Sequence, residues 1–425
     1  MQVTIYPSKI SGTITLPASK SALHRAIIAA GMANGTSTIH NVTFNDDAFY
    51  TLKALEKWGI KYTYTNQTLS IVGMPIPKTS RLSVDCGESA STLRLLLPIF
   101  SQLKQATFIG SESLFSRPLD IYQKIYKRQN LSFDLQKTYL QISGKIKAGT
   151  YIIDNPTSSQ FISGLLFYLP LLEEDSIIEI NNLVSKPYVD LTIDFLKLAG
   201  IKIIIKGNQI IIPGRQTYLP FEVSIEGDLS QIGYFLTLGA FSGPITIKNV
   251  CFNSTQGDKK IIDLFTSIGA NIETYDNYLI IKESKLTNFT YDLVDTPDLG
   301  LLLFALASCV DGKSTITNIS RLKFKESNRL EIGLKIITAL NASYKLLDED
   351  NTIEIYGNTL PKVIDEFDSH GDHRVVFTLT SISPLLSKPL TITNAGVISK
   401  SYPRFWNDFE QLGGIIRKWK QSRLI

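Results

Sequence analysis

The sequence contains few of the residues that disulfide-stabilised folds and most metal sites require. Its 425 residues include only three cysteines, Cys86, Cys251 and Cys309, and none of them forms a CxxC pair. Four histidines occur, and no two of them have HxxxH spacing. A disulfide framework or a zinc site of the usual spacing is therefore not expected. We expect a protein that works without a metal or any other cofactor.

Long apolar runs and dense clusters of charge are also missing. The longest apolar stretch, LGLLLFALASCV, is far shorter than the roughly 20 residues that span a membrane. The net charge is +4, and no Lys/Arg-rich run suggests nucleic acid as a partner. The N-terminal MQVTIYPSKI lacks the profile of a signal peptide. We therefore expect a cytoplasmic protein whose partners are small molecules, with neither nucleic acid nor a membrane among them.

What the chain does contain is a repeat. Each copy has a small polar cap, an apolar helix, a break and a β-rich strand. The copies begin at Ser19, Glu88, Ser158, Asp228, Thr296 and Gly371, which are 69, 70, 70, 68 and 75 residues apart. A repeat of this kind determines the fold, and it places six helix N-termini in equivalent positions.

A second pattern lies between these copies. Segments such as LKALEKWGIKYTYTNQTLSIVG and IDLFTSIGANIETYDNYLIIKE predict an amphipathic helix and then two strands joined by a polar turn. The C-terminal WNDFEQLGGIIRKWKQ matches only the first part of this pattern. Together the two patterns predict an α/β protein of six units. Six such units favour two domains of three units each.

Basic residues recur at the helix starts and in short loops beside small polar residues. They are Lys20, Arg25, Arg117, Arg329, Arg374 and Lys400. A lysine at the positive end of a helix is unfavourable unless an anion binds there. Solvated surface charge would explain any one of these residues, but not their recurrence at equivalent positions. Because the chain has no GxxxxGK[ST] loop, we expect a cleft that binds more than one phosphate or carboxylate through these side chains.

Other polar residues accompany the basic ones. Ser158, Ser159 and Gln160 begin one predicted helix, and Ser185 and Tyr188 lie in the following loop, NNLVSKPYVD. Asp298 and Glu326 are candidate acid–base groups. A simpler interpretation is also open, in which Asp298 is a helix cap and Glu326 pairs locally with Lys325 or Arg329.

At this point the motifs match a family. PASKSALHRA, DCGESASTLR, SSQF, LVSKPYVD, EGDLSQIGYF, NSTQGD, TPD, KFKESNRL, GDHR and ISKSYPRFW occur in the order and spacing of that family. The chain resembles the 5-enolpyruvylshikimate-3-phosphate synthase family over essentially its whole length. The resemblance implies an α/β fold of six βαβαββ repeats, three in each of two inside-out α/β barrels. Residues 1–17 and 228–425 would form domain 1, residues 18–227 would form domain 2, and the active site would lie in the cleft between them.

The family transfers the carboxyvinyl group of phosphoenolpyruvate to the 5-hydroxyl of shikimate 3-phosphate and releases phosphate. The resemblance assigns shikimate 3-phosphate to Lys20, Ser21, Arg25, Ser158, Ser159, Gln160, Ser185, Tyr188, Asp298 and Lys325. It assigns phosphoenolpyruvate to Lys20, Ala90, Arg117, Gln160, Arg329, Arg374 and Lys400. Asp298 is the candidate base for the 5-hydroxyl, and Glu326 is the candidate proton carrier at C3, assisted by Lys20. The family also implies a monomer.

The chain departs from the usual family motifs at a few positions. Ala18 and His24 replace Gly and Asn in the first motif, and Ala90 replaces a glycine next to the phosphoenolpyruvate site. A methyl group there should hinder the longer inhibitor glyphosate more than the substrate, so we expect reduced glyphosate sensitivity.

Two other functions remain open from sequence. One is the related enolpyruvyl transfer to UDP-N-acetylglucosamine, although that family has Lys-Asn where this chain has Lys20-Ser21. The other is a non-catalytic anion-binding relative, against which the intact Lys20, Asp298, Glu326 and Lys400 argue.

Overall fold

The computed structural model describes residues 1–419 and divides the chain into two compact units. Ala18–Glu226 form one unit, called here the continuous unit. Met1–Pro17 and the part of the chain that follows Glu226 form the other, called here the split unit. Residues 420–425, which end the predicted domain 1 and include the last two residues of the C-terminal repeat pattern, lie outside the described residues.

The continuous unit contains three repeats. The first consists of β14 (Glu222–Ser224), α1 (Lys20–Met32), β3 (Thr36–His40), α2 (Asp46–Trp58), β4 (Lys61–Thr65) and β5 (Thr68–Val72). The second consists of β6 (Arg81–Asp85), α3 (Ala90–Phe100), β7 (Gln105–Ile109), α4 (Glu112–Phe115), α5 (Asp120–Arg128), β8 (Ser132–Leu135) and β9 (Tyr139–Ser143). The third consists of β10 (Thr150–Asp154), α6 (Gln160–Tyr168), η1 (Leu169–Leu171), β11 (Ser176–Asn181), α7 (Lys186–Leu198), β12 (Ile204–Lys206) and β13 (Gln209–Ile212).

The split unit contains three more repeats. The fourth consists of β2 (Gly12–Thr15), α8 (Leu229–Ser242), β15 (Ile245–Lys248), η2 (Gly257–Lys259), α9 (Lys260–Ser267), β16 (Asn271–Thr274) and β17 (Tyr278–Lys282). The fifth consists of β18 (Thr290–Asp292), η3 (Pro297–Leu299), α10 (Gly300–Ser308), β19 (Gly312–Thr317), η4 (Ser320–Phe324), α11 (Arg329–Ala339), β20 (Ser343–Leu347) and β21 (Thr352–Gly357). The sixth consists of β22 (Glu366–Asp368), α12 (His373–Ser381), η5 (Ser383–Leu385), β23 (Leu390–Thr393), η6 (Ala395–Lys400), α13 (Phe405–Gln411), β24 (Ile415–Trp419) and β1 (Gln2–Tyr6).

Each repeat forms one four-stranded sheet with the same strand order. In the second repeat the order is β6-β7-β9-β8, where β6 and β7 are parallel and the other neighbours are antiparallel. A helix connects the parallel pair, as such a crossover requires, and a tight hairpin joins the last two strands. The predicted α/β fold of six βαβαββ repeats is confirmed.

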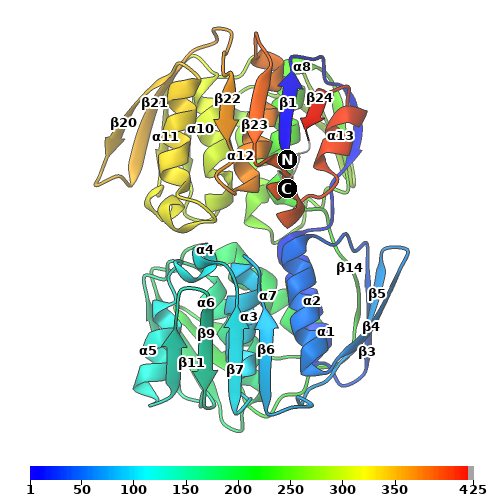
Figure 1. Ribbon diagram of the computed structural model, residues 1–425, viewed down its shortest axis with the longest axis vertical. Helices are drawn as coiled ribbons and strands as arrows, with labels where there is room; N and C mark the ends of the chain where they lie inside the picture. The colour runs from blue at the N-terminus through cyan, green and yellow to red at the C-terminus, as the bar shows by residue number, and fades with distance from the viewer. Residues whose placement is uncertain (420–425) are drawn as a thin grey trace, which may run out of the picture. The chain divides into compact units, whose positions relative to one another are not determined.

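Strands distant in sequence complete one repeat of the continuous unit and two of the split unit. In the fourth repeat, β2 from the N-terminal segment pairs in parallel with β15. After α13 the C-terminal repeat supplies only one strand, β24, and β1 from the N-terminus fills the missing place between β23 and β24 (Figure 1). In the same way β14, which follows the third repeat, pairs with β3 of the first. This explains why the C-terminal pattern in the sequence is incomplete: its last strand is the first strand of the chain.

An asparagine marks the end of the second strand in five of the six repeats. These residues, Asn41, Asn182, Asn249, Asn318 and Asn394, all have positive φ between 53° and 63°. Asparagine tolerates this left-handed conformation better than most residues. Each side chain also donates a hydrogen bond to the end of the parallel neighbour, for example Asn41 to the carbonyl of Ile225. The asparagine therefore ends the strand and fastens it to the first strand of its repeat.

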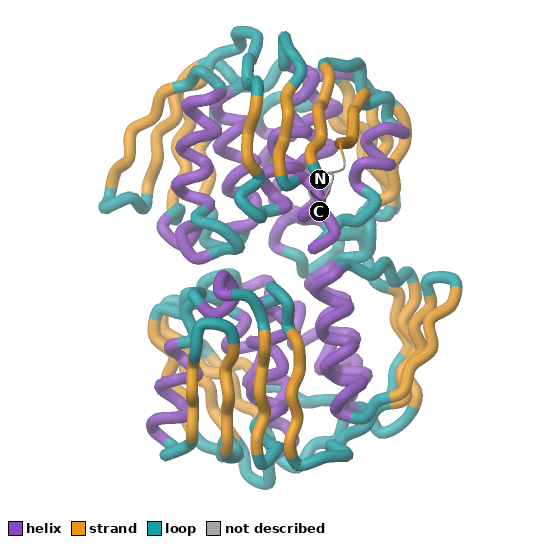
Figure 2. The backbone as a smooth tube through the Cα atoms, in the orientation of Figure 1, coloured by secondary structure: helices purple, strands orange, loops and turns teal. Residues whose placement is uncertain are grey.

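The first helix of each repeat is buried, and the strands lie outside the helices within each unit (Figure 2). Helix α10 is buried along its entire length, whereas α2 buries only one face. An apolar helix surrounded by other elements and an amphipathic helix at the surface are the two expected outcomes of these patterns. Among residues 1–419, no helix combines the length and the apolar character that crossing a bilayer requires.

Candidate active site

The six helix N-termini predicted from the repeat are all present. Helices α1, α3, α6, α8, α10 and α12 begin at Lys20, Ala90, Gln160, Leu229, Gly300 and His373. Ser19, Ser89, Asp228 and Asp372 accept hydrogen bonds from backbone N–H groups in the first turns that follow them. Helix α10 begins later than its motif because Pro297–Leu299 first form a 3₁₀ turn. The predicted site residues at these N-termini therefore lie where free N–H groups and the helix dipole favour anions.

Lys20 is the first residue of α1, and it is paired with a residue that the sequence did not single out. Its Nζ lies 2.9 Å from Oδ2 of Asp47 in the first turn of α2, and both side chains are largely buried. The carboxylate offsets the unfavourable position of the ammonium group at the positive end of α1.

Arg25 is a buried cation that bonds only to neutral oxygens. Its Nε donates to Oγ1 of Thr192 (2.8 Å), and its terminal nitrogens donate to the carbonyls of Ser21 (2.8 Å) and Tyr188 (2.9 Å). Among the described residues no carboxylate pairs with it. Burial lowers the pKa of Arg25 to about 10, so the group remains charged at neutral pH. A buried charge without a counter-ion is costly, and an anionic ligand would supply the counter-ion.

Ser185 and Tyr188, on the same side of the continuous unit as Arg25, begin α7. Ser185 is buried and has φ 53° and ψ 42°, a left-handed conformation that is uncommon for serine. Strain of this kind is often kept where a side chain must face a ligand. Because Arg25 donates to the Tyr188 carbonyl, three predicted residues, Arg25, Ser185 and Tyr188, lie near one another where α1 and α7 begin.

Gln160 is held from both sides at the start of α6. Its Oε1 accepts a hydrogen bond from Nη1 of Arg94 (3.1 Å), and its Nε2 donates to Oγ of Ser91 (2.9 Å). Ser158 accepts from the backbone N–H of Gln160, and Ser159 is the buried residue before the helix. The first turns of α3 and α6 are thus joined through side chains.

Arg117 carries unused hydrogen-bonding capacity. Only 8% of the residue is exposed, and its Nε and Nη2 are buried without a partner among the described residues. Buried N–H donors are almost always paired in proteins, so unpaired ones need an explanation. Two parallel N–H groups match the geometry of a phosphate or a carboxylate.

Two of the departures from the family motifs also lie here. Ala90 is the first residue of α3, and its methyl group is partly buried against the core of the continuous unit. His24 is buried, and Nδ1 lies 2.7 Å from Oγ1 of Thr51. Burial, together with Lys20 and Arg25 nearby, lowers the pKa of His24 well below its ordinary value. His24 is therefore neutral and adds no charge to this part of the unit.

In the split unit the predicted residues converge on Asp298. Its Oδ1 accepts from Arg329 (2.8 Å) and lies 3.4 Å from Nζ of Lys325, while its Oδ2 accepts from Arg374 (3.0 Å). Burial lowers the pKa of Lys325, although Asp298 opposes the change. One carboxylate thus connects Lys325 with two of the arginines predicted to bind phosphoenolpyruvate.

Arg329 is surrounded by carboxylates. Besides Asp298, it contacts Glu326 (2.6 Å) and the fully buried Asp372 (2.7 Å), and it is itself 1% exposed. Burial alone would lower the pKa of Arg329, but Asp372, Glu326 and Asp298 raise it above its ordinary value. Burial alone would raise the pKa of Asp372, and the Arg329 guanidinium lowers it. This network keeps Arg329 charged and fixed in one orientation.

Arg374 and Lys400 have neutral partners as well. Arg374 is buried and donates to the hydroxyls of Tyr234 (3.2 Å) and Ser230 (3.1 Å). Lys400 Nζ donates to the carbonyl of Gly371 (2.7 Å), at the turn before α12. The predicted residues of the split unit therefore gather at the starts of α8, α10, α11 and α12.

The sequence did not single out three residues of these clusters. In the sequence Asp47 has the pattern of an acidic residue that stabilises the first turn of a helix. Asp372, in GDHR, has the pattern of a helix cap, and in the structure it does cap α12 while also binding Arg329. The available signal for Arg94 was a charged residue inside the apolar helix ASTLRLLLPIF, because such residues are rarely buried unless paired.

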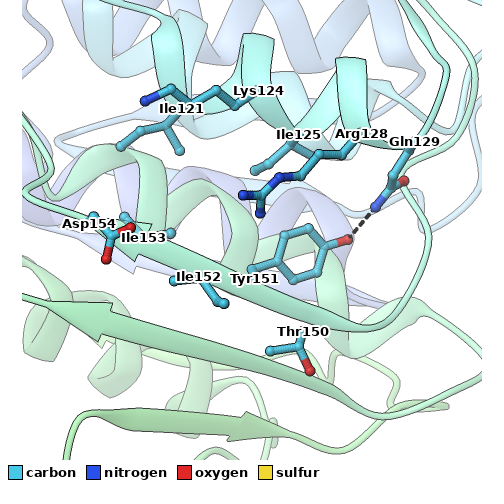
Figure 3. A pocket seen from close by; sticks show the side chains of 10 residues that line it. All are labelled: Ile121, Lys124, Ile125, Arg128, Gln129, Thr150, Tyr151, Ile152, Ile153 and Asp154. Carbon is cyan, nitrogen blue, oxygen red and sulfur yellow. Dashed lines mark hydrogen bonds between the residues drawn. The ribbon is translucent and has the colours of Figure 1, made fainter.

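A hollow of the continuous unit lies elsewhere, between α5 and β10. It has a volume of about 320 Å³, and Figure 3 shows Lys124 and Arg128 on one side and Tyr151, hydrogen-bonded to Gln129, on the other. A similar hollow of about 270 Å³ lies at the equivalent seam between α2 and β6. None of the predicted site residues lines either hollow. Both hollows lie where the second helix of one repeat packs beside the first strand of the next repeat. Within residues 1–419 no group of three or more His, Cys, Asp or Glu side chains is arranged to hold a metal ion.

Comparison with solved structures defines the class of fold. An EPSP synthase from Acinetobacter baumannii matches 98% of this chain and all of its own with a TM-score of 0.79 at 22% identity. The enolpyruvyl transferase NikO from Streptomyces tendae matches 98% of both chains with a TM-score of 0.78 at 14% identity. The fold is that of the enolpyruvyl transferases.

Sequence relatives identify the family within that class. The family model for EPSP synthase (3-phosphoshikimate 1-carboxyvinyltransferase) matches residues 5–409. Proteins named 3-phosphoshikimate 1-carboxyvinyltransferase from Clostridium kluyveri and Clostridioides difficile are 38% and 36% identical, each over 99% of both chains. A third, from Clostridium perfringens, is 37% identical over 98% of this chain and 99% of its own. This chain belongs to the EPSP synthase family, and it is an enzyme.

Proposed function

We propose that this chain transfers the enolpyruvyl group of phosphoenolpyruvate to the 5-hydroxyl of shikimate 3-phosphate, a step of the shikimate pathway to aromatic amino acids. Family membership over nearly the whole length supports this activity over transfer to UDP-N-acetylglucosamine. The structural observation that carries the proposal is that two buried arginines have no carboxylate partner among the described residues. Arg25 bonds only to neutral oxygens, and Arg117 has unpaired nitrogens, as anion-binding residues would before their ligands arrive.

Shikimate 3-phosphate is assigned to two groups of residues. Ser21 and Arg25 bind its carboxylate, and Asp298 and Lys325 bind on the side of its ring hydroxyls. Its phosphate is assigned to the donors that begin α6 and α7, which are Ser158, Ser159, Gln160, Ser185 and Tyr188. These helix starts offer both hydroxyl groups and backbone N–H groups to a doubly charged phosphate.

The carboxylate of phosphoenolpyruvate is assigned to Arg329 and Arg374. Both are fixed by Asp298, so their forks are oriented before the substrate binds. The phosphate of phosphoenolpyruvate is assigned to Arg117, Gln160 and Lys400, with Ala90 at the first turn of α3. Lys20, held by Asp47, contacts both substrates.

The reaction balances as an addition followed by an elimination. Asp298 accepts the proton of the 5-hydroxyl while the oxygen forms a bond to C2 of phosphoenolpyruvate. The electron pair of the C2–C3 double bond takes a proton at C3 from Glu326, which gives a methyl group. Phosphate then leaves from C2, and C3 returns its proton to Glu326 as the double bond forms again. Lys20 stabilises the charge that develops on the departing phosphate.

The experiment that tests the proposal measures phosphate release. Purified protein is given phosphoenolpyruvate with shikimate 3-phosphate or with UDP-N-acetylglucosamine as the acceptor. We expect release only with shikimate 3-phosphate, and its loss in Lys20→Ala. Release that depends on UDP-N-acetylglucosamine would favour the related transferase. No release from folded protein with either acceptor would favour a non-catalytic anion-binding protein.

Three properties expected from the sequence remain predictions. They are a monomeric state, a cytoplasmic location and activity without an added cofactor. Light scattering during gel filtration tests the first, fractionation of the source cells tests the second, and assay of chelator-treated protein tests the third.

A further inference from the structure

Arg94 connects two segments to which the proposed function assigns the phosphate of phosphoenolpyruvate. It lies one turn after Ala90 in α3 and is 6% exposed. Its Nη1 donates to Oε1 of Gln160 (3.1 Å), and its Nη2 donates to the carbonyl of Pro118 (2.8 Å). Because Pro118 directly follows Arg117, one guanidinium group contacts one proposed phosphate ligand and the backbone next to the other.

We propose that Arg94 is a positioning residue for phosphoenolpyruvate. It fixes which way the Gln160 amide faces, and it holds the backbone that carries Arg117. The inference rests on the proposed function, because it takes Gln160 and Arg117 as phosphate ligands.

The orientation of Gln160 follows from the chemistry of its neighbours. A guanidinium group has only donors, whereas an amide has one accepting oxygen and one donating NH₂ group. Arg94 therefore requires Oε1 of Gln160 to face it, and the NH₂ group must point the other way, toward Ser91 (2.9 Å). That direction leads to the first turn of α3, where free N–H groups favour an anion. With the amide reversed, two donors would oppose each other and a carbonyl oxygen would face the phosphate.

Arg94 is itself held firmly, as a positioning residue must be. Its guanidinium carbon lies 4.9 Å from the ring centroid of Phe161, the residue after Gln160. The Tyr122 hydroxyl lies within hydrogen-bonding distance of the backbone carbonyls of Arg94 (2.7 Å) and Phe161 (3.2 Å).

A glycine allows this close packing of α3 against α6. A Cβ atom added at Gly164 would lie 2.4 Å from the carbonyl oxygen of Arg94 and 2.2 Å from the Tyr122 hydroxyl. Such distances are shorter than atoms can approach, so only glycine fits. The two helices therefore meet closely around the residues that hold Arg94 and Gln160.

The test compares Michaelis constants for the two substrates. Arg94→Met keeps the apolar stem and removes both hydrogen bonds, and Arg94→Lys keeps the charge without the fork. We expect Arg94→Met to raise the KM for phosphoenolpyruvate about tenfold, as loss of a hydrogen bond to a charged group does. The KM for shikimate 3-phosphate should rise by no more than about twofold, because Gln160 is only one of the five residues assigned to its phosphate. Arg94→Lys should raise the first constant by about threefold. The exposed Arg128→Met at the end of α5 is the matched control and should change neither constant.

A double-mutant cycle tests whether Arg94 acts through Gln160. In a Gln160→Ala background, the effect of Arg94→Met on the KM for phosphoenolpyruvate should fall to about threefold or less, because only the Pro118 contact remains. An undiminished tenfold effect in that background would overturn the inference. So would equal changes in both Michaelis constants, or an unchanged constant for phosphoenolpyruvate in a folded variant.

The design separates this inference from the proposed function. If the unmodified protein releases no phosphate with shikimate 3-phosphate, the proposed function fails and the inference fails with it. If the unmodified protein is active and the Arg94 variants retain its constants, only the inference fails. Should Arg94→Met not fold, Arg94→Lys carries the test, and an unchanged KM for phosphoenolpyruvate in that variant overturns the inference.

Discussion

Lys20 and Asp47 form an ion pair in which Nζ and Oδ2 lie 2.9 Å apart, and their side chains are only 14% and 13% exposed. The pair joins the first turns of α1 and α2. The carbonyl of Asp47 also accepts a hydrogen bond from Thr92 in α3 (3.2 Å). Asp47 therefore places the proposed catalytic lysine relative to the helix that begins with Ala90.

Asp47→Asn should lower kcat/KM about tenfold, which corresponds to ~1.4 kcal/mol, because it replaces a charge-assisted hydrogen bond with a neutral one. The measurement is steady-state phosphate release over a range of both substrates. Glu56→Gln in the same helix is the control, since that carboxylate pairs with Lys53 at the exposed surface. If both variants keep the activity of the unmodified protein, Asp47 has no part in placing Lys20.

Ala90→Gly should make the enzyme more sensitive to glyphosate. The methyl group lies at the first turn of α3, and removing it widens the proposed phosphoenolpyruvate site by one carbon atom. A change of this size is typically worth about 10- to 200-fold between two ligands of different length. The inhibition constant of glyphosate should fall in the variant, while the KM for phosphoenolpyruvate should change less. Equal inhibition constants in the two proteins would contradict the prediction.

Arg117→Met should weaken substrate binding and stabilise the fold. The substitution removes a buried charge that has unpaired nitrogens, each of which costs about 1–3 kcal/mol when left unsatisfied. We expect the midpoint of thermal unfolding to rise and the KM for phosphoenolpyruvate to increase at least about tenfold. Inorganic phosphate should stabilise the unmodified protein more than the variant.

Arg81→Met, at an exposed position of β6, provides the control for Arg117. It should alter neither the unfolding midpoint nor the Michaelis constants. A destabilised Arg117→Met variant would mean that this guanidinium group is part of the structural framework rather than a site that awaits an anion.

Asp372→Asn should reduce stability in a pH-dependent way. The variant leaves Arg329 buried with one counter-ion fewer, which typically costs about 3–5 kcal/mol at neutral pH. Because the pKa of Asp372 is lowered in the folded state, its contribution is complete above the unfolded-state value of about 4. It is lost as the pH falls through the lower, folded-state pKa. The difference in stability between the two proteins should therefore shrink in acid.

Urea unfolding at a series of pH values measures this difference. Asp276→Asn, at an exposed turn of the same unit, is the control and should match the unmodified protein at every pH. A difference between Asp372→Asn and the unmodified protein that stays constant from neutral to acid pH would show that the carboxylate charge is not the source of the effect.

Much of the candidate site could be read from local sequence. Ser19, Ser89 and Asp228 cap helices where the repeat predicted helix starts, because capping depends only on residues within the same turn. The asparagines that end the second strands follow the same logic, since a left-handed residue is a property of a single position. The family motifs then assigned roles to residues that lie at these starts.

Partners that are distant in sequence could not be read in this way. The pairing of Asp298 with Arg374 spans 76 residues, and that of Arg25 with Thr192 spans 167. No local periodicity reports such contacts, because they depend on how the repeats pack. The family resemblance assigned Arg329 to phosphoenolpyruvate, and the sequence did not reveal that Asp372 already holds this arginine.

The sequence alone determined the number and kind of repeats, the residues at which helices begin, and the family. Each of these can be recognised from short patterns of adjacent residues. Only the tertiary structure decided which strands complete which sheets and which charges meet. Gln2–Tyr6 close the last repeat, and Glu222–Ser224 begin the first, although each lies far along the chain from its partners. Hydrogen bonding along a strand edge and attraction between buried charges act through space, so their outcome depends on the folded arrangement of the whole unit.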